Sequence, residues 1–204
     1  RRTRDAGGRE MTIVLASGSP RRSEILHLLG LGHEIRPPDV DERLRSGEEP
    51  GVQARRLAVE KASSTAGHGD DLILAADTLV VLGEEILGKP VDEADALRML
   101  MKLQGRRHEV HTGLALRFGD RIESDVAVTS VWFRSLDAAE CEEYVASGEP
   151  LDKAGAYGIQ GLGAVLVQRI EGEYFNVMGL PVQLLLSLLA RFGLRYAYGS
   201  LEEG

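Results

Sequence analysis

The sequence of 204 residues predicts an α/β fold built on a mixed sheet. Short apolar runs with the length of buried strands alternate with segments whose apolar residues recur at helical spacing, which is typical of α/β proteins. The alternation is interrupted by two long strand-like segments, His108 to Phe118 and Ile122 to Phe133, with Gly119-Asp120 between them. Such a pair predicts an antiparallel hairpin, so we expect a mixed sheet and not a purely parallel one.

The first predicted elements are a buried strand and a capped helix. Ile13-Val14-Leu15-Ala16 is an apolar run that ends in Ser17-Gly18-Ser19-Pro20, which is typical of a strand running into a loop. Ser19 is expected to cap a helix that has Pro20 at its first position and ends at Gly30. The other elements expected before the hairpin are a strand at 33–36, a helix at 52–66, a strand at 72–76 that breaks at Asp77-Thr78, an extended segment at 79–82 and a helix at 92–103.

The remaining elements complete one expected domain. After the hairpin we expect a helix at 138–147, a glycine-rich loop, a strand at 164–170 and a helix at 181–190. The sequence contains neither an internal repeat nor a long linker. We therefore predict a single domain from residue 12 to residue 195, a disordered N-terminal extension at 1–11 and a flexible tail at 196–204.

The composition limits the classes of function that the chain can have. Its net charge of −8 argues against a broad surface for nucleic acid or acidic membrane. A nucleotide substrate remains compatible, because it needs only a local group of basic side chains. The single cysteine, Cys141, makes the cytoplasm the expected compartment, and no apolar run approaches the roughly twenty residues that span a bilayer.

The junction between the first strand and its helix is the first candidate for chemistry. Small residues at 16–20 allow close approach, and the free amide groups of a helix start can bind phosphate. Arg21 and Arg22 follow directly, and a guanidinium fork can bind two phosphate oxygens at once. A capped surface helix with solvated arginines explains these residues equally well on this evidence alone.

Asp77 is the second candidate. It follows four apolar residues and is expected at the end of a strand, where ligands bind in open α/β sheets. A carboxylate at that place can hold a divalent metal or accept a proton from an attacking water. A turn aspartate that bonds its own backbone is the structural alternative.

Three lysines extend the candidate set. Lys61, Lys89 and Lys153 each lie beside an acid or a turn. A solvated surface role explains any one of them, but it explains poorly the presence of all three together with Arg21 and Arg22.

The glycine-rich stretch 155–163 and two histidines complete the search for motifs. The stretch has neither the dinucleotide-binding order of glycines nor a Walker A sequence. The amide of Gln160 offers a donor and an acceptor, which suits the edge of a base, although bonding to the backbone explains it equally well. His108 and His111 are three residues apart on a predicted strand, so their rings point to opposite faces and are interpreted as structural.

Five ordered motifs make the chain resemble the Maf family. The resemblance covers roughly Thr12 to Arg191, and five motifs in order are far more specific than a lone glycine pattern. The motifs are Leu15-Ala16-Ser17-Gly18-Ser19-Pro20-Arg21-Arg22, Ala76-Asp77-Thr78, Leu87-Gly88-Lys89-Pro90, residues 152–161, and Asn176-Val177-Met178-Gly179-Leu180-Pro181.

The resemblance implies a fold related to the inosine-triphosphate pyrophosphatases, with an elongated mixed sheet in two lobes and the site in the cleft between them. It also implies attack of water at the α-phosphate with release of pyrophosphate, assisted by Mg²⁺ or Mn²⁺. Asp77 falls on the general-base position, and Asp77 and Glu42 fall on the metal-site acids. The positions that select or bind substrate fall on Ser17, Arg21, Arg22, Lys61, Thr78, Lys89, Lys153 and Gln160.

The branch of the family is implied by two of the motifs. Asp77-Thr78 and the segment 158–161 are similar to the branch that acts on dTTP and UTP. The branch that prefers a methylated guanine nucleotide typically has Asp-Gln and a serine-containing loop. The resemblance therefore implies a hydrolase acting on phosphoric anhydrides that cleaves dTTP, UTP and modified pyrimidine nucleotides to the monophosphate, with a house-cleaning role and an influence on cell division.

Two other functions stay open, as does the assembly of the chain. One is a nucleotide-binding regulator of septum formation without turnover, and the other is a pyrophosphatase for non-canonical purine nucleotides. The expected partner is a nucleoside triphosphate, with neither nucleic acid nor a membrane, and a homodimer is one option for the assembly.

Overall fold

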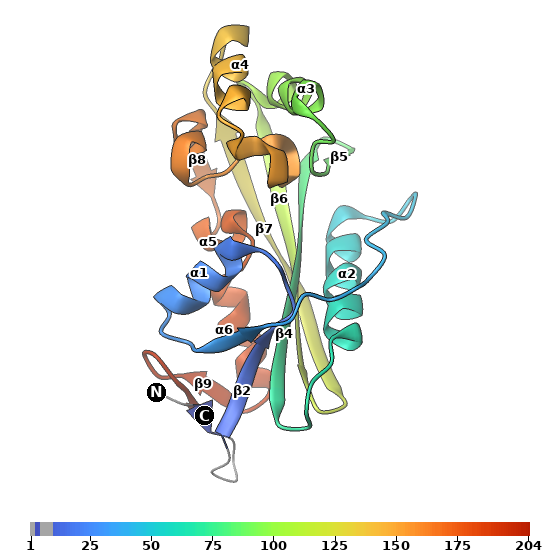
Figure 1. The fold of residues 1–204 in the computed structure, drawn as a ribbon, viewed down its shortest axis with the longest axis vertical. Helices are drawn as coiled ribbons and strands as arrows, with labels where there is room; N and C mark the ends of the chain where they lie inside the picture. The colour runs from blue at the N-terminus through green and yellow to red at the C-terminus, as the bar shows by residue number, and fades with distance from the viewer. Residues whose placement is uncertain (1–2, 5–9) are drawn as a thin grey trace. The chain divides into compact units, whose positions relative to one another are not determined.

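The computed structural model describes residues 3–4 and 10–204 (Figure 1). The chain forms two compact units. Unit 1 comprises Arg1–Asp77, Thr112–Ala127 and Gly179–Gly204, and unit 2 comprises Thr78–His111 and Val128–Met178. Three of the boundaries fall inside strands, and the fourth falls between Met178 and Gly179, after the last residue of a helix.

The strands form one mixed sheet and a small separate hairpin. They are β1 (Thr3–Arg4), β2 (Glu10–Leu15), β3 (His33–Ile35), β4 (Asp71–Leu82), β5 (Glu85–Leu87), β6 (Arg107–Phe118), β7 (Arg121–Phe133), β8 (Val167–Glu171), β9 (Leu194–Tyr196) and β10 (Leu201–Glu203). The order in the large sheet is β1-β2-β4-β6-β7-β8, with β3 on β2 and β5 on β4. Because β2 is parallel to β3 and β4 while β4–β5 and β7–β8 are antiparallel, the predicted mixed sheet is confirmed.

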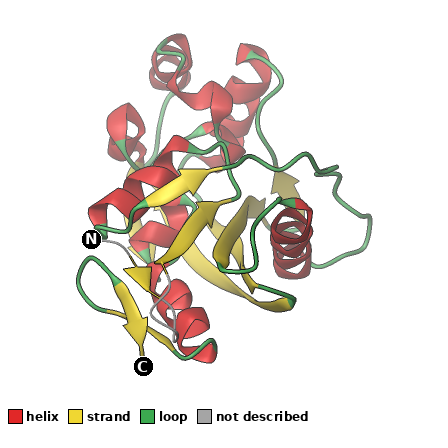
Figure 2. Cartoon of the chain, turned by 60° about the horizontal axis from the view of Figure 1, so that its bottom comes forward, coloured by secondary structure: helices red, strands yellow, loops and turns green. Residues whose placement is uncertain are grey.

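Helices flank the strands, as Figure 2 shows. The α-helices are α1 (Pro20–Leu28), α2 (Pro50–Ser64), α3 (Glu93–Leu103), α4 (Ala138–Ala146), α5 (Tyr174–Met178) and α6 (Val182–Arg191). Short 3₁₀ turns at Glu149–Asp152, Ala154–Ala156 and Gly161–Leu166 occupy much of the predicted glycine-rich loop. None of the helices in the described part of the chain is long and apolar enough to cross a membrane.

The start of α1 differs from the prediction in one detail. Ser19 occupies the N-cap position, but its side chain makes no capping hydrogen bond. The hydroxyl of Ser17 accepts a hydrogen bond from the Ser19 amide at 3.2 Å instead. This bond orders the loop before the helix and does not cap an amide of the first helical turn.

The core of unit 1 brings α2 unusually close to the sheet. Buried apolar side chains of β2, β4, β6 and α2 and of the residue after β2 pack together, most of them alanine, and they are Val14, Ala16, Ala58, Ala62, Ile73, Ala75 and Ala115. A Cβ atom added to Gly113 of β6 would lie 2.2 Å from the carbonyl oxygen of Ala54 in α2. Only glycine permits this approach, because real Cβ contacts essentially never fall below about 3 Å.

Unit 2 has its own core, built by α3, α4 and the strands beside them. Its larger side chains include Phe133 and Tyr157, whose rings meet edge to face with centroids 4.7 Å apart. Helix α4 begins with a capping box, in which Asp137 and Glu140 each accept a backbone hydrogen bond from the other. Each unit therefore buries apolar side chains of its own.

The expected break of the second strand at Asp77-Thr78 is wrong. β4 continues through these residues, and Asp77 lies inside a strand of 12 residues. The parallel pairing with β2 ends at Leu15–Leu74, and β5 then pairs antiparallel with the end of β4 from Val80 onward. Partners on either side of Asp77 keep the chain extended, so Asp77 lies beyond the end of β2 and not beyond the end of its own strand.

The two ends of the chain also differ from the sequence expectation. The tail expected at 196–204 contains β10, which pairs antiparallel with β9 and buries Leu201 at 2% exposure. The strands have three residues each, too few for a recognisable alternation. Of the extension expected at 1–11, residues 1–2 and 5–9 lie outside the described residues, Thr3–Arg4 pairs with the start of β2, and β2 begins at Glu10.

Candidate active site

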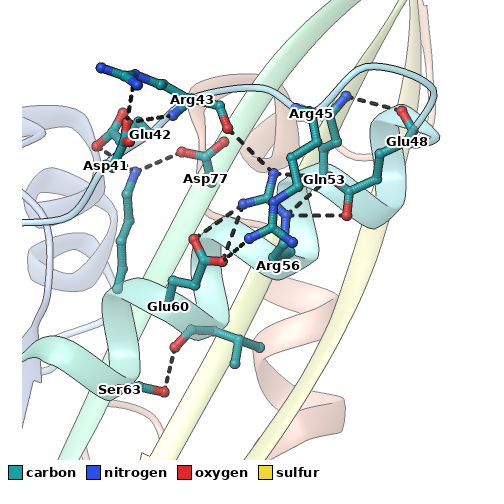
Figure 3. A network of polar contacts seen from close by, with 12 residues as sticks. Asp41, Glu42, Arg43, Arg45, Glu48, Gln53, Arg56, Glu60, Ser63 and Asp77 are labelled. Atoms are coloured by element: carbon teal, nitrogen blue, oxygen red, sulfur yellow. Dashed lines mark hydrogen bonds and ion pairs between the residues drawn. The ribbon is translucent and has the colours of Figure 1, made fainter.

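A buried lysine in unit 1 bridges two carboxylates. The Nζ atom of Lys61 lies 2.6 Å from Oδ1 of Asp77 and 2.9 Å from Oε1 of Glu42. The side chains of Lys61 and Asp77 are 7% and 9% exposed, whereas Glu42 is 58% exposed. Glu42 and Asp77 accordingly lie near each other in Figure 3. The ion pair with Asp77 offsets the cost of taking both charges out of water.

Three different elements deliver these side chains. Asp77 projects from β4, Lys61 from the last turn of α2, and Glu42 from the segment 36–49 between β3 and α2, which we call the Glu42 loop. The small residues of the unit 1 core let α2 lie directly against the sheet. Lys61 can therefore reach a carboxylate of the sheet while its own side chain stays buried.

The junction between β2 and α1 adds a hydroxyl and a guanidinium. The hydroxyl oxygen of Ser17 accepts a hydrogen bond from Nη1 of Arg22 at 2.8 Å, and Nε of Arg22 donates to the carbonyl of Gly179 at 2.8 Å. Burial lowers the pKa of Arg22, while the charges of Asp77 and Glu42 act in the opposite direction. An arginine remains charged in a protein, so this guanidinium is a fixed positive charge of the same cluster.

Unit 2 holds the other predicted substrate-binding residues. Thr78, Lys153 and Gln160 are half-buried and Lys89 is exposed. Lys153 lies 2.6 Å from Oδ1 of Asp152 and also donates to the backbone carbonyl of Glu149.

A backbone contact joins two motifs of unit 2. The Gly155 amide donates to the carbonyl of Gly88 at 3.0 Å, which connects the Gly-Lys-Pro segment with the glycine-rich stretch. Gly155 has a φ of 68°, and an added Cβ would lie 2.9 Å from Val80. Any other residue at this position would be strained and crowded.

The glycine-rich stretch is held by a carboxylate that sequence reasoning missed. The Glu149 carboxylate accepts hydrogen bonds from the amides of Leu162 at 2.8 Å and Gly163 at 3.0 Å, and from the Tyr144 hydroxyl at 2.9 Å. Burial raises the pKa of Glu149, but the hydrogen bonds from Gly163 and Leu162 outweigh it and leave the pKa below its ordinary value. No local pattern signals such a role, because the partners lie 13 and 14 positions later.

The structure thus gathers one part of the predicted set and places the rest in the other unit. Ser17, Arg22, Glu42, Lys61 and Asp77 form one cluster in unit 1, and the charge of Arg21 acts on Arg22. Thr78, Lys89, Lys153 and Gln160 belong to unit 2. A cleft that joins the two sets stays a prediction.

The two histidines have separate partners. Nε2 of His108 lies 2.8 Å from the hydroxyl of Tyr157, and Nε2 of His111 lies 3.0 Å from Oε2 of Glu109. Burial lowers the pKa of His108 to about 4. The described residues contain no group of three or more histidine, cysteine or acidic side chains that would hold a metal by themselves.

Asp77 and Glu42 nevertheless fit a divalent cation whose remaining ligands come from a bound substrate and from water. Both carboxylates converge on one positive charge, the ammonium of Lys61. Mg²⁺ in nucleotide-handling proteins is commonly held by one or two carboxylates, with phosphate oxygens and water completing its shell. Two acids are therefore sufficient for such a site.

Comparisons with known proteins agree with these motifs. The family description "Maf-like protein" matches residues 12–192. A dTTP/UTP pyrophosphatase of Syntrophomonas wolfei is 50% identical over 184 residues, which are 88% of this chain and 96% of that protein. A dTTP/UTP pyrophosphatase of Chromobacterium violaceum is 51% identical over 187 residues, 89% of this chain and 94% of that protein.

Solved structures give a weaker likeness. The Ham1 protein of Staphylococcus aureus is similar with a TM-score of 0.44 and 16% identity, over 76% of this chain and 79% of that one. This value is too low to carry an argument about function. The family match over most of the chain, together with relatives at half identity that it spans almost in full, shows that the chain belongs to the Maf family.

Proposed function

We propose that this chain hydrolyses dTTP and UTP to the monophosphate and pyrophosphate. Membership of the Maf family supports the proposal, as do the relatives named dTTP/UTP pyrophosphatases. The observation that carries it is the buried Asp77, which is paired with Lys61 beside Glu42 and the Arg22 guanidinium. A carboxylate and several cations in one place are what water attack on a phosphoric anhydride needs.

In the proposed reaction Asp77 orients a water molecule and takes its proton while the water oxygen attacks the α-phosphorus. The bond between the α-phosphorus and the bridging oxygen breaks, and pyrophosphate leaves with the electron pair. Arg22 and Lys61 stabilise the negative charge that grows on the phosphates. Ser17 holds Arg22 in place through their hydrogen bond of 2.8 Å. Mg²⁺ or Mn²⁺ held by Asp77 and Glu42 would supply Lewis-acid stabilisation of phosphate charge.

The residues of unit 2 belong to the proposal as substrate-binding groups. Thr78 and Gln160 are proposed to contribute to selection of the base, together with Arg21 of unit 1, and Lys89 and Lys153 to bind phosphate. The hydrogen bonds of Glu149 support a rigid backbone around Gln160. Modified pyrimidine nucleotides belong to the proposed substrate class. The cytoplasmic location, the homodimer and the influence on cell division stay predictions.

The deciding experiment measures pyrophosphate release with Mg²⁺ or Mn²⁺ over a panel of canonical and modified nucleoside triphosphates. The wild type is expected to prefer dTTP and UTP. Asp77→Asn should lower turnover at least about 10²-fold, the smaller end of the usual contribution of a general base, without unfolding the protein. Asp125→Asn is the matched control, because it changes an aspartate of the same unit that is 45% exposed and pairs with Arg191 at 2.9 Å.

Each other outcome points to a specific alternative. Tight nucleotide binding without turnover in the wild type would favour the regulator. A preference for non-canonical purine nucleotides, or for a methylated guanine nucleotide, would move the chain to another substrate class. A near-normal rate in Asp77→Asn would remove the role of Asp77 as the base.

A further inference from the structure

Gln53 is a buried polar side chain that the proposed chemistry does not use. It is 2% exposed and lies in the first turns of α2. Its Oε1 accepts a hydrogen bond from the Arg45 amide at 2.8 Å, and its Nε2 donates to the Glu48 carbonyl at 3.0 Å. Both partners are backbone groups of the Glu42 loop. A buried amide is costly unless it is hydrogen-bonded, and this one is bonded to the loop on both sides.

Two further side chains of α2 hold the same segment. The Arg56 side chain is 14% exposed, and its Nε donates to both carboxylate oxygens of Glu48, at 3.1 and 3.0 Å. It also makes a long contact of 3.5 Å with the Arg43 carbonyl, while Glu60 accepts from Arg45 at 3.2 Å. Figure 3 shows Gln53, Arg56 and Glu60 facing the loop from the helix.

These anchors all lie shortly after Glu42 in the chain. The contact at Arg43 is one residue away, and the hydrogen bond at Arg45 is three residues away. The helix that provides the anchors also carries Lys61, the partner of Glu42, eight residues after Gln53. Gln53 and Lys61 are therefore about 12 Å apart along the axis of one rigid helix, which holds the loop anchor and the ammonium in a fixed relation.

The ion pair alone is a poor way to hold Glu42. Its side chain is 58% exposed, and exposed ion pairs contribute little because water screens them and two long side chains lose freedom. Hydrogen bonds between a buried amide and the backbone are not screened by water, and they order one long side chain instead of two. Gln53 and Arg56 therefore hold the part of the loop that follows Glu42 through bonds that do not depend on the Glu42 ion pair.

We infer that Gln53 is a positioning residue of the active site, which holds the Glu42 loop so that the Glu42 carboxylate stays beside Lys61 and Asp77. This inference rests on the proposed function for its catalytic consequence. A purely structural role, in which Gln53 only seals the start of α2, predicts loss of stability without any dependence on Glu42. The positioning role and the structural role predict different results when substitutions at Gln53 and Glu42 are combined.

The test is a double-mutant cycle of Gln53→Met and Glu42→Gln, with kcat/KM for dTTP and the Mg²⁺ concentration for half-maximal rate as readouts. Glu42→Gln and Gln53→Met should each lower kcat/KM about tenfold and raise the Mg²⁺ requirement. The double variant should be no worse than Glu42→Gln alone. Arg55→Met is the matched control, because Arg55 on the same helix donates to Ser124 at 2.9 Å and not to the loop.

A measurement without substrate tests the anchor separately. Hydrogen exchange at the Arg45 amide should be at least about tenfold faster in Gln53→Met and unchanged in Arg55→Met. If Gln53→Met does not fold, Glu48→Gln takes its place. It removes the ion pair of Arg56 at the half-buried end of the loop and should produce a smaller change in the same direction.

The outcomes separate this inference from the proposed function. Losses that multiply in the double variant, or unchanged exchange at Arg45, would overturn the positioning role and leave the pyrophosphatase proposal intact. A wild type without turnover would overturn the pyrophosphatase proposal. In that case faster exchange at Arg45 and throughout residues 39–49 in Gln53→Met would still support the anchor, and unchanged exchange would reject it.

Discussion

Two lysine–aspartate pairs of the same length have different surroundings. The N–O distance is 2.6 Å both for Lys61 with Asp77 in unit 1 and for Lys153 with Asp152 in unit 2. The side chains of the first pair are 7% and 9% exposed, while Asp152 in the second is 63% exposed. Distance therefore does not distinguish them. Burial does, because water screens the second pair, whose acid is exposed, more than it screens the first.

Substituting each lysine in turn is the strongest test of the difference between the two pairs. Lys61→Met should lower the free energy of unfolding by about 3–5 kcal/mol, because the Asp77 carboxylate is left buried without its ammonium. Lys153→Met should cost only about 1 kcal/mol, because its partner Asp152 is exposed to water and one hydrogen bond to the Glu149 carbonyl is lost. Urea unfolding in the presence of a metal chelator measures both. Equal costs would mean that the burial of the Lys61 pair has no energetic consequence.

His108 extends the comparison to a buried titratable group that has no charged partner among the described residues, since its hydrogen-bond partner is the neutral hydroxyl of Tyr157. Its pKa is about 4 in the folded chain and about 6.5 when unfolded. Between these values the unfolded chain binds more protons, so stability should fall as the pH drops from about 6.5 to about 4, by up to about 3 kcal/mol. His108→Gln should remove this dependence, and His68→Gln, which changes an exposed histidine, should not. Unfolding curves at several pH values test it, and an unchanged slope in His108→Gln would contradict it.

Gly113 tests whether the burial of Lys61 depends on the close approach of α2. A Cβ at Gly113 would meet the Ala54 carbonyl at 2.2 Å, so Gly113→Ala must push the helix away from the sheet. We expect a loss of about 1–3 kcal/mol, typical of overpacking, and a lower rate of pyrophosphate release. Gly69→Ala is the control, since an added Cβ there has nothing within 4 Å. A full rate with an unchanged melting temperature in Gly113→Ala would show that the approach is not needed.

A second contrast concerns the way the two loops are held. The Glu42 loop is bonded by the amide of Gln53 and the guanidinium of Arg56, both from a regular helix. The glycine-rich stretch is bonded by the carboxylate of Glu149, from a short 3₁₀ turn. In both cases side chains replace the regular backbone pairing that a loop lacks. The proposed chemistry uses none of these three holding side chains directly.

Much of the candidate site was visible in the sequence because its motifs are local. The segment 16–22 places small residues and two arginines at a strand-to-helix junction, and the structure has that junction. Asp77 and Lys61 were identified from their neighbours, although their mutual contact was not. Gln53 and Glu149 were missed because an amide or an acid that bonds a distant loop has no distinctive local pattern.

The mixed α/β class, the order of most helices and strands, and the family could be predicted from the sequence. These depend on the spacing of apolar residues and on short ordered motifs, which are properties of neighbouring positions. Three features are seen only in the folded chain: β4 runs unbroken through Asp77, residues 194–203 form a hairpin, and Lys61 and not Lys153 is buried together with its acid. Those outcomes depend on which strand lies alongside and on how closely a helix approaches the sheet, and both are set by contacts between residues far apart in the chain.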